Sequence, residues 1–121
     1  GFDMSDSKCI SHCAILNDWQ SGLFDINDCC DSPHIECNSQ GLVISVDLTF
    51  TDTLLSQRAL EVKVSGVLSI QLAKLSSMQK LSVKNNDITG TIPSEYGGMK
   101  SLKSLDLSMN KLKGIFFVVG S

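Results

Sequence analysis

The sequence lacks three features that would each point to a particular class of protein. No apolar run approaches the roughly 20 residues of a membrane helix, and the longest one, Ile115–Val119, has five. Basic residues are not in excess, because 10 Lys and Arg stand against 13 Asp and Glu, for a net charge of -3. The start, at Gly1, shows no charged leader followed by an apolar stretch. We therefore expect no membrane span, no nucleic-acid partner, and a secretion signal that was removed or never present.

Familiar catalytic motifs are absent as well. The sequence contains no GxSxG, no phosphate-binding loop and no HExxH. Carboxylates such as Asp47, Asp52 and Glu61 have no paired partner at an interpretable spacing, and Gly97-Gly98 is expected in a turn and not in a phosphate cradle. The prediction is a protein that is not an enzyme and that uses no cofactor.

The composition is that of a folded domain. Hydrophobic residues make up 42% of the chain and charged residues 19%, which excludes a disordered, charge-rich polymer. A chain of 121 residues is long enough to bury a single core.

The cysteines are confined to the first third of the chain. They are Cys9, Cys13, Cys29, Cys30 and Cys37. Neighbouring side chains point apart, so Cys29 and Cys30 are expected to have different partners. We expect Cys30 to pair with Cys37, and Cys29 to pair with Cys13 or Cys9, which leaves one spare thiol. Two such small rings contribute about 2–3 kcal/mol each, and they predict an oxidised, extracellular N-terminal cap.

A zinc site is the alternative interpretation of the same region. Cys9 and His12, and again His34 and Cys37, are three residues apart, a spacing that can bind one metal ion. The adjacent cysteine pair is awkward for tetrahedral ligation, and neither half is a CxxC knuckle. A catalytic Cys–His pair is weaker still, since nothing marks one thiol as activated. We favour disulfides, no metal, and surface or loop positions for His12 and His34.

The rest of the chain repeats itself at a fixed spacing. We call this spacing the repeat period, and it is the distance in sequence from Leu81 to Leu105. The other aligned pairs are Leu75 with Met99, Met78 with Leu102, Val83 with Leu107, Asn86 with Asn110, Ile88 with Leu112, Gly90 with Gly114 and Ile92 with Phe116. One period further back, only the second half of the repeat is preserved, from Val64 to Leu72.

The repeat has a simple physical interpretation. The pattern LxVxxNxI that begins at Leu81 predicts a short strand followed by a turn. Inward-facing Asn86 and Asn110 can satisfy backbone groups of neighbouring coils and form a ladder along the stack, and Gly90 permits a tight return. Each coil has an apolar stripe that it cannot bury alone. We predict an α/β solenoid, a short right-handed stack of coils with a parallel sheet on its concave side.

The repeat also resembles a known family. The segment LSSMQKLSVKNNDITGTIPSEYGG, Leu75–Gly98, is similar to the plant-type extracellular leucine-rich repeat, LxxLxxLxLxxNxLxGxIPxxLxx. MKSLKSLDLSMNKLKGIF continues it through Phe116, and the segment from Cys13 to Leu48 resembles that family's cysteine-bearing N-terminal cap. Members are typically secreted recognition proteins: ectodomains of receptor kinases and receptor-like proteins, and inhibitors of microbial polygalacturonases. The resemblance implies a secreted leucine-rich-repeat module.

This resemblance divides the chain into three parts. They are the cap at 1–48, an insertion or degenerate coil at 49–63, and leucine-rich repeats at 64–121, of which the last is incomplete. The insertion follows from spacing. The last inward strand residue precedes the turn glycine by the same distance in both clear repeats, Val83 to Gly90 and Leu107 to Gly114, but Leu48 precedes Gly66 by more than twice that distance. In the cap we expect one helix, at about Ile10–Gln20.

Residues between the inward-facing ones are expected to point to solvent on the concave sheet. They are Lys80, Ser82, Lys84 and Asn85 in one coil and Ser104, Asp106, Ser108 and Met109 in the next. Lys80 and Lys84 predict a positive strip beside Asp106, unless these are ordinary solvated residues. The predicted function is recognition of a protein or glycan through this face. The alternative is an N-terminal part of a receptor kinase or receptor-like ectodomain in signalling.

The C-terminal end is expected to expose apolar residues. Phe117 replaces the proline of the family's GxIP turn, so the last coil is incomplete. The residues expected to face an absent neighbour are Leu105, Leu107, Leu112, Phe116, Phe117 and Val119. Such an end favours association, and we predict end-to-end self-association or marginal stability.

Overall fold

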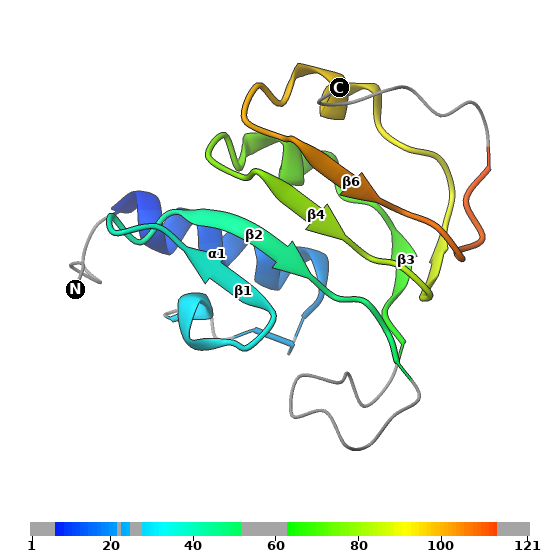
Figure 1. Cartoon of the computed structure of the whole chain (residues 1–121), viewed down its shortest axis with the longest axis horizontal. Helices are drawn as coiled ribbons and strands as arrows, with labels where there is room; N and C mark the ends of the chain where they lie inside the picture. The colour runs from blue at the N-terminus through cyan, green and yellow to red at the C-terminus, as the bar shows by residue number, and fades with distance from the viewer. Residues whose placement is uncertain (1–6, 22, 25–27, 52–62, 114–121) are drawn as a thin grey trace.

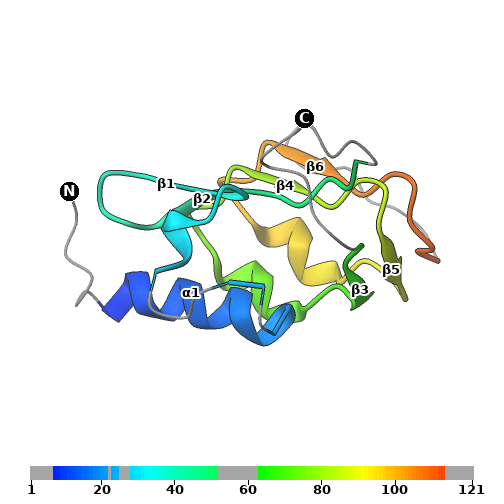
Figure 2. The ribbon, with the colours of Figure 1, turned by 90° about the horizontal axis from the view of Figure 1, so that it is seen from below.

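The structure, a computed structural model, describes residues 7–21, 23–24, 28–51 and 63–113. Its elements are α1 (Ser7–Trp19), the 3-10 helix η1 (Cys29–Asp31), β1 (Ile35–Cys37), β2 (Val43–Asp47), β3 (Ser65–Val67), η2 (Ile70–Lys74), β4 (Lys80–Ser82), β5 (Asp87–Thr89), η3 (Ser94–Gly98) and β6 (Ser104–Asp106). Figure 1 shows β1, β2, β4 and β6 side by side, and Figure 2 shows α1, η2 and η3 as a layer on one side of this sheet. No helix within these ranges has the length and apolar character to cross a membrane.

The main sheet carries the predicted period. Its order is β1-β2-β4-β6, with β1 antiparallel to β2 and the other neighbours parallel. Ser45 lies opposite Lys80, and Lys80 lies opposite Ser104. The distance in sequence from Lys80 to Ser104 is one repeat period. The distance from Ser45 to Lys80 is longer, and it exceeds the repeat period by as many residues as the Leu48–Gly66 spacing exceeds the Val83–Gly90 spacing. The sequence repeat is therefore a stack of strands in register.

A second, two-stranded parallel sheet forms where each coil turns back. In it β3 pairs with β5, with Gly66 opposite Ile88, whereas the sequence repeat aligns Gly66 with Gly90. Gly66 and Gly90 have φ angles of 86° and 81°, which L side chains rarely adopt. A Cβ atom at Gly90 would also lie 3.0 Å from Val67 Cγ1. Gly90 is thus required by both its backbone angle and its contact with the preceding coil.

One core runs from the cap through the coils. Fully buried side chains come from α1 (Leu16), from η2 (Leu72) and η3 (Tyr96), and from the inner face of the sheet (Val46 and Leu81). The Tyr96 hydroxyl donates to the carbonyl of Ser69 at 2.6 Å, and burial raises the pKa of this phenol. Leu81 is an inward-facing strand residue that the repeat predicts, and Leu72 and Tyr96 lie one repeat period apart.

Asn86 and Asn110 take equivalent places in successive coils. The side chain of Asn86 is 2% exposed. Its Oδ1 accepts from the Val64 amide at 2.8 Å, and its Nδ2 donates to the carbonyl of Leu48 at 2.7 Å. Asn110 accepts from the Ile88 amide at 2.9 Å and donates to carbonyls of its own and the preceding coil. These bonds form a ladder that joins each coil to the coil before it.

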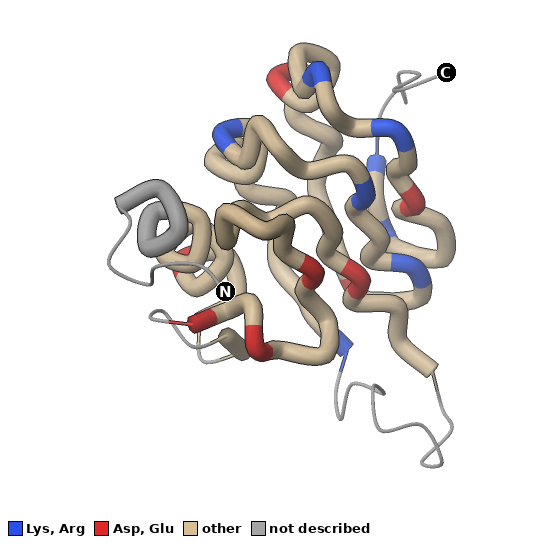
Figure 3. The backbone as a smooth tube through the Cα atoms, turned by 60° about the vertical axis from the view of Figure 1, so that its left-hand side comes forward, with Lys and Arg blue, Asp and Glu red and all other residues tan. Residues whose placement is uncertain are grey.

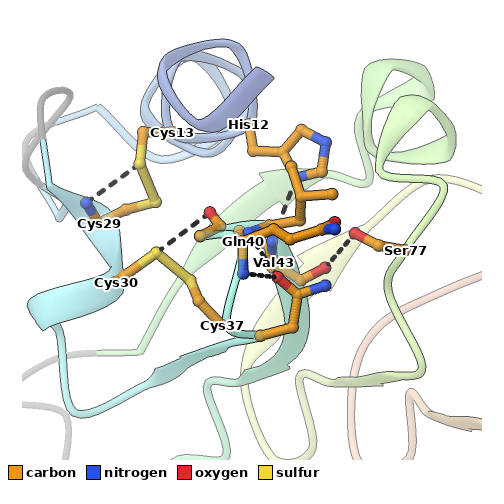
Figure 4. The surroundings of a disulfide bond; sticks show 11 residues. His12, Cys13, Cys29, Cys30, Cys37, Gln40, Val43 and Ser77 are labelled. Atoms are coloured by element: carbon orange, nitrogen blue, oxygen red, sulfur yellow. Dashed lines mark hydrogen bonds between the residues drawn. A yellow bond between two sulfur atoms is a disulfide. The ribbon is translucent and has the colours of Figure 1, made fainter. Parts of the chain in front are cut away.

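Two disulfides hold the cap together, as Figure 4 shows. Cys13–Cys29 joins α1 to η1, and Cys30–Cys37 joins η1 to β1. The predicted Cys30–Cys37 pair is confirmed, and Cys29 pairs with Cys13; the side chain of Cys9 lies outside the described part. Because Cys37 is oxidised, it is not a thiolate ligand for the alternative zinc site.

Helix α1 also joins the cap to the first coil. It spans Ser7–Trp19, so it starts before the expected Ile10 and ends just before the expected Gln20. At its C-terminal end, Trp19 Nε1 donates to the carbonyl of Val67 at 3.1 Å, and Gln20 Nε2 donates to the carbonyl of Ser65 at 2.9 Å. These side chains cover backbone acceptors of β3.

The predicted apolar end of the stack is only partly within the described residues. Leu105, Leu107 and Leu112 are half-buried and pack against the core. Phe116, Phe117 and Val119 lie outside the described residues. End-to-end self-association stays a prediction.

His12 is buried, so the expected surface or loop position is wrong for this residue. Its side chain is 8% exposed, and Nδ1 accepts a hydrogen bond from the Val43 amide at 3.2 Å. Figure 4 shows the ring between α1 and the start of β2. The imidazole therefore supplies an acceptor to a strand that the helix covers.

Acidification is expected to destabilise the protein through His12. Burial lowers the pKa of His12 below 6.5, so the folded state binds fewer protons than the unfolded state and stability rises with pH. This contribution is complete above about pH 6.5 and is lost as the pH falls below it. We expect the melting temperature to drop more from about pH 7 to about pH 5 in the native protein than in His12→Asn, which keeps an acceptor but does not titrate. Parallel melting curves for the two proteins would contradict this assignment.

Candidate ligand-binding face

The candidate site is the side of the main sheet that faces away from α1, η2 and η3, which we call the concave face. Because the strands are in register, side chains form rows across them. One row holds Glu36, Ser45, Lys80 and Ser104, and the next holds Asp47, Ser82 and Asp106. The concave face therefore begins inside the cap and continues over the coils.

Most of the predicted concave residues are accessible. Lys80, Lys84, Ser104, Ser108 and Met109 are exposed, and Asn85 and Asp106 are half-buried. Ser82 differs from the prediction, because it is 4% exposed and its Oγ shares a hydrogen bond of 2.8 Å with Thr49 Oγ1. Thr49 follows β2 and covers this position, so Ser82 is a structural residue.

Asn85 and Met109 have an unusual backbone conformation in common. Their φ angles are 61° and 58°, in the left-handed region, and they lie one repeat period apart. Asn85 Nδ2 donates to the carbonyl of Phe50 at 3.0 Å, so its amide is engaged within the fold. Met109 is 66% exposed, and it occupies a conformation that favours Asn or Gly.

The expected positive strip is a mixed-charge surface. Lys80 Nζ lies 3.3 Å from Asp47 Oδ2, and both side chains are nearly half exposed. Burial raises the pKa of Asp47, but hydrogen bonds from Thr49 and the charge and hydrogen bond of Lys80 outweigh it and lower this pKa overall. Asp47 therefore has a partner that sequence spacing did not reveal, and the charge of Lys80 is balanced locally.

Asp106 provides a second carboxylate on this face. Its Oδ1 accepts from the Ser108 hydroxyl at 2.6 Å and from the Ser108 amide at 3.1 Å. These hydrogen bonds lower the pKa of Asp106, and the charge of Lys84 adds to the effect. The coil side of the concave face thus presents charges of both signs at neutral pH.

The end of the concave face beside the cap is hollowed. The volume is about 420 Å³, and the lining residues are Ser32, Pro33, His34, Ile35, Glu36, Ser45, Asp47 and Lys80. We call this the cap-end hollow.

The sequence analysis did not predict Glu36, Ser45 and Asp47 as site residues, because it aligned only coils that lie one repeat period apart. A signal for the last two was present, since the strand GLVISVDL aligns with the next strand once Ser45 is set against Lys80. Within the described ranges, no group of His, Cys, Asp and Glu is arranged to hold a metal ion.

Comparison with known proteins points to one family. The leucine-rich-repeat family model matches residues 77–99 and 101–119. The chain is 37% identical over 89 residues to phytosulfokine receptor 1 of Arabidopsis thaliana, covering 72% of the chain and 8% of the receptor. It is 46% identical over 103 residues to MDIS1-interacting receptor like kinase 1 of the same plant, covering 85% and 9%. The chain thus matches a small part of each of these receptors.

Solved structures agree with this match. The ectodomain of the Arabidopsis receptor kinase HAESA, in complex with an IDA peptide hormone, has a TM-score of 0.65 and 27% identity, covering 87% of the chain and 18% of the ectodomain. The BIR2 ectodomain of Arabidopsis thaliana has a TM-score of 0.60 and 26% identity, covering 92% and 57%. The resemblance deduced from the repeats is confirmed. The chain carries plant-type leucine-rich repeats behind a cysteine-bearing N-terminal cap.

Proposed function

We propose that this chain is an extracellular, non-catalytic binding module that recognises a peptide or protein segment through its concave face. The observation that carries the proposal is the continuous sheet face from the cap to β6, with accessible charges of both signs. Charge complementarity of this kind gives specificity for protein surfaces, and we favour a peptide or protein over a glycan for that reason. The similar HAESA ectodomain was solved with a peptide hormone.

Receptor signalling is the wider setting of the same proposal. The relatives named above are receptors or receptor-like kinases, of which the chain covers 8% and 9%. We infer that the chain forms the N-terminal part of such an ectodomain, a right-handed solenoid with more coils than this chain supplies. The two disulfides support an extracellular location.

Replacing Lys84 by Glu is expected to weaken ligand binding without changing the melting temperature. Peptides would be selected from a random phage-displayed library on the immobilised, oxidised protein, and their affinities for variants measured. We expect Lys84→Glu to reduce affinity about tenfold, because Lys84 is an exposed concave residue. The control is Lys74→Glu, the same charge reversal at an exposed position of η2, in the other layer. If both variants bind the selected peptides as the native protein does, the concave face is not the site.

A further inference from the structure

We propose that the cap-end hollow binds a cationic side chain, an arginine or lysine of the ligand. The proposal rests on the proposed function of the concave face and assigns a chemistry to one end of it. Three observations carry it: the distribution of charge along the chain, the Glu36 carboxylate in the hollow, and the exposed Pro33 in the same lining.

Charge is divided unevenly between the cap and the coils. Residues 1–48 contain eight Asp and Glu and one Lys, a net charge of -7, whereas residues 64–121 contain seven Lys and three Asp and Glu, a net charge of +4. Figure 3 shows acidic positions gathered toward the cap and most basic positions on the coils. The hollow lies at the cap end, and the net negative charge of that segment favours a cationic over an anionic ligand.

The lining of the hollow has one uncompensated negative charge. Asp47 is paired with Lys80 at 3.3 Å. Glu36 is exposed, and within the described ranges its carboxylate takes part in neither an ion pair nor a hydrogen bond. In register, Glu36 is next to Ser45, and Ser45 is next to Lys80. Of the two carboxylates that line the hollow, Asp47 thus has a cationic partner among the described residues, and Glu36 does not.

The shape of the hollow suits a long cationic side chain better than a metal ion. Pro33 is exposed in the lining and offers an apolar surface to a methylene stem. The Ile35 side chain is buried in the core, and Glu36, the next residue of β1, is exposed. A guanidinium group can make a bidentate pair with one carboxylate. A divalent cation needs several oxygen ligands, and the second carboxylate here, Asp47, is already held by an ammonium group.

The test is a titration of the isotope-labelled protein, followed by NMR, with two short peptides. One is acetyl-Gly-Arg-Gly-amide, and the other carries citrulline, which has the shape of arginine without its charge. We expect saturable shifts of the Glu36 and Ser45 amides, with an affinity for the arginine peptide at least about fivefold higher than for the citrulline peptide, because only the former forms a charge-assisted pair. Glu36→Gln should abolish this difference. The control is Glu95→Gln, at an exposed position of η3, and it should preserve it.

Two results would overturn the inference. The citrulline peptide would bind as tightly as the arginine peptide, or Glu36→Gln would leave the preference intact. The outcome of this titration can be distinguished from the outcome of the library selection that tests the concave face as a whole. If library-selected ligands need Lys84 and the arginine preference does not depend on Glu36, the proposed function stands and the cation site falls. If the arginine peptide needs Glu36 while no selected ligand is sensitive to Lys84→Glu, the cation site stands and the proposed function falls.

Discussion

Replacing Asn86 by alanine is expected to lower the free energy of unfolding by about 3 kcal/mol or more, because several buried backbone groups lose their partners at once. The Val64 amide would lose its acceptor, and the carbonyls of Leu48 and Val83 would lose a donor. At 2% exposure, water cannot replace the amide. Urea unfolding, with the slopes of the two proteins compared, measures the difference.

The equivalent residue one coil later is the control. Asn110 makes the same kinds of bond but is half-buried, so water can reach the groups that Asn110→Ala leaves behind. We expect a loss of about 1 kcal/mol for this variant. A third variant, Asn86→Asp, keeps an acceptor for Val64 but turns a carboxylate oxygen toward the carbonyls of Leu48 and Val83, so we expect it to lose at least as much stability as Asn86→Ala. Equal, small losses for Asn86→Ala and Asn110→Ala would contradict a buried ladder.

The ladder also shows what sequence alone could predict. Asn86, Gly90 and the buried Leu81 each recur one repeat period later, and each has a local physical reason for its place: an amide for backbone groups, a positive φ angle, and an apolar stripe. In a repeat protein of this kind, each repeat packs only against the repeats next to it. The period therefore predicted the register of β4 with β6, the buried position of Leu81 and the turn at Gly90.

The contacts that sequence could not predict cross the junction between the cap and the coils. Asp47 contacts Lys80, and His12 contacts Val43, and neither pair is separated by a multiple of the repeat period. The step from β2 to β4 is longer than the repeat period and breaks the alignment there. The antiparallel pairing of β1 with β2, with its irregularity at Glu36, has no counterpart in the described coils. For this reason, the cap-end hollow and the burial of Ser82 and His12 emerged only from the structure.

The candidate site itself was predicted in part for the same reason. Exposed Lys84 and half-buried Asp106 follow from the repeat, because alternate residues of a strand face opposite sides of a sheet. Their partners on the cap side do not follow from it. The cap is thus more than an end cover, since it adds β1 to the main sheet and contributes Glu36 and Asp47 to the lining of the cap-end hollow.

Removing the Cys13–Cys29 disulfide is expected to have the second large effect. The bond closes a loop with a sequence separation of 16, and chain entropy alone assigns it about 3 kcal/mol. Both cysteines are fully buried, so Cys13→Ala with Cys29→Ala also removes packed sulfur atoms. The bond fixes α1, which carries His12 against Val43 and Trp19 against β3. We expect the double variant to lose at least about 3 kcal/mol in urea unfolding under non-reducing conditions.

The matched control is the other disulfide, removed by Cys30→Ala with Cys37→Ala. Its sequence separation is 7, for which chain entropy gives about 2.5 kcal/mol, and both its cysteines are half-buried. The smaller ring does not include α1, so the helix should stay docked and Trp19 fluorescence should change little in the folded baseline. In the Cys13→Ala, Cys29→Ala protein, that baseline should shift as the Trp19 bond to Val67 weakens. If the smaller ring proves the more costly to remove, α1 is held by its packing, and Cys13–Cys29 is secondary to it.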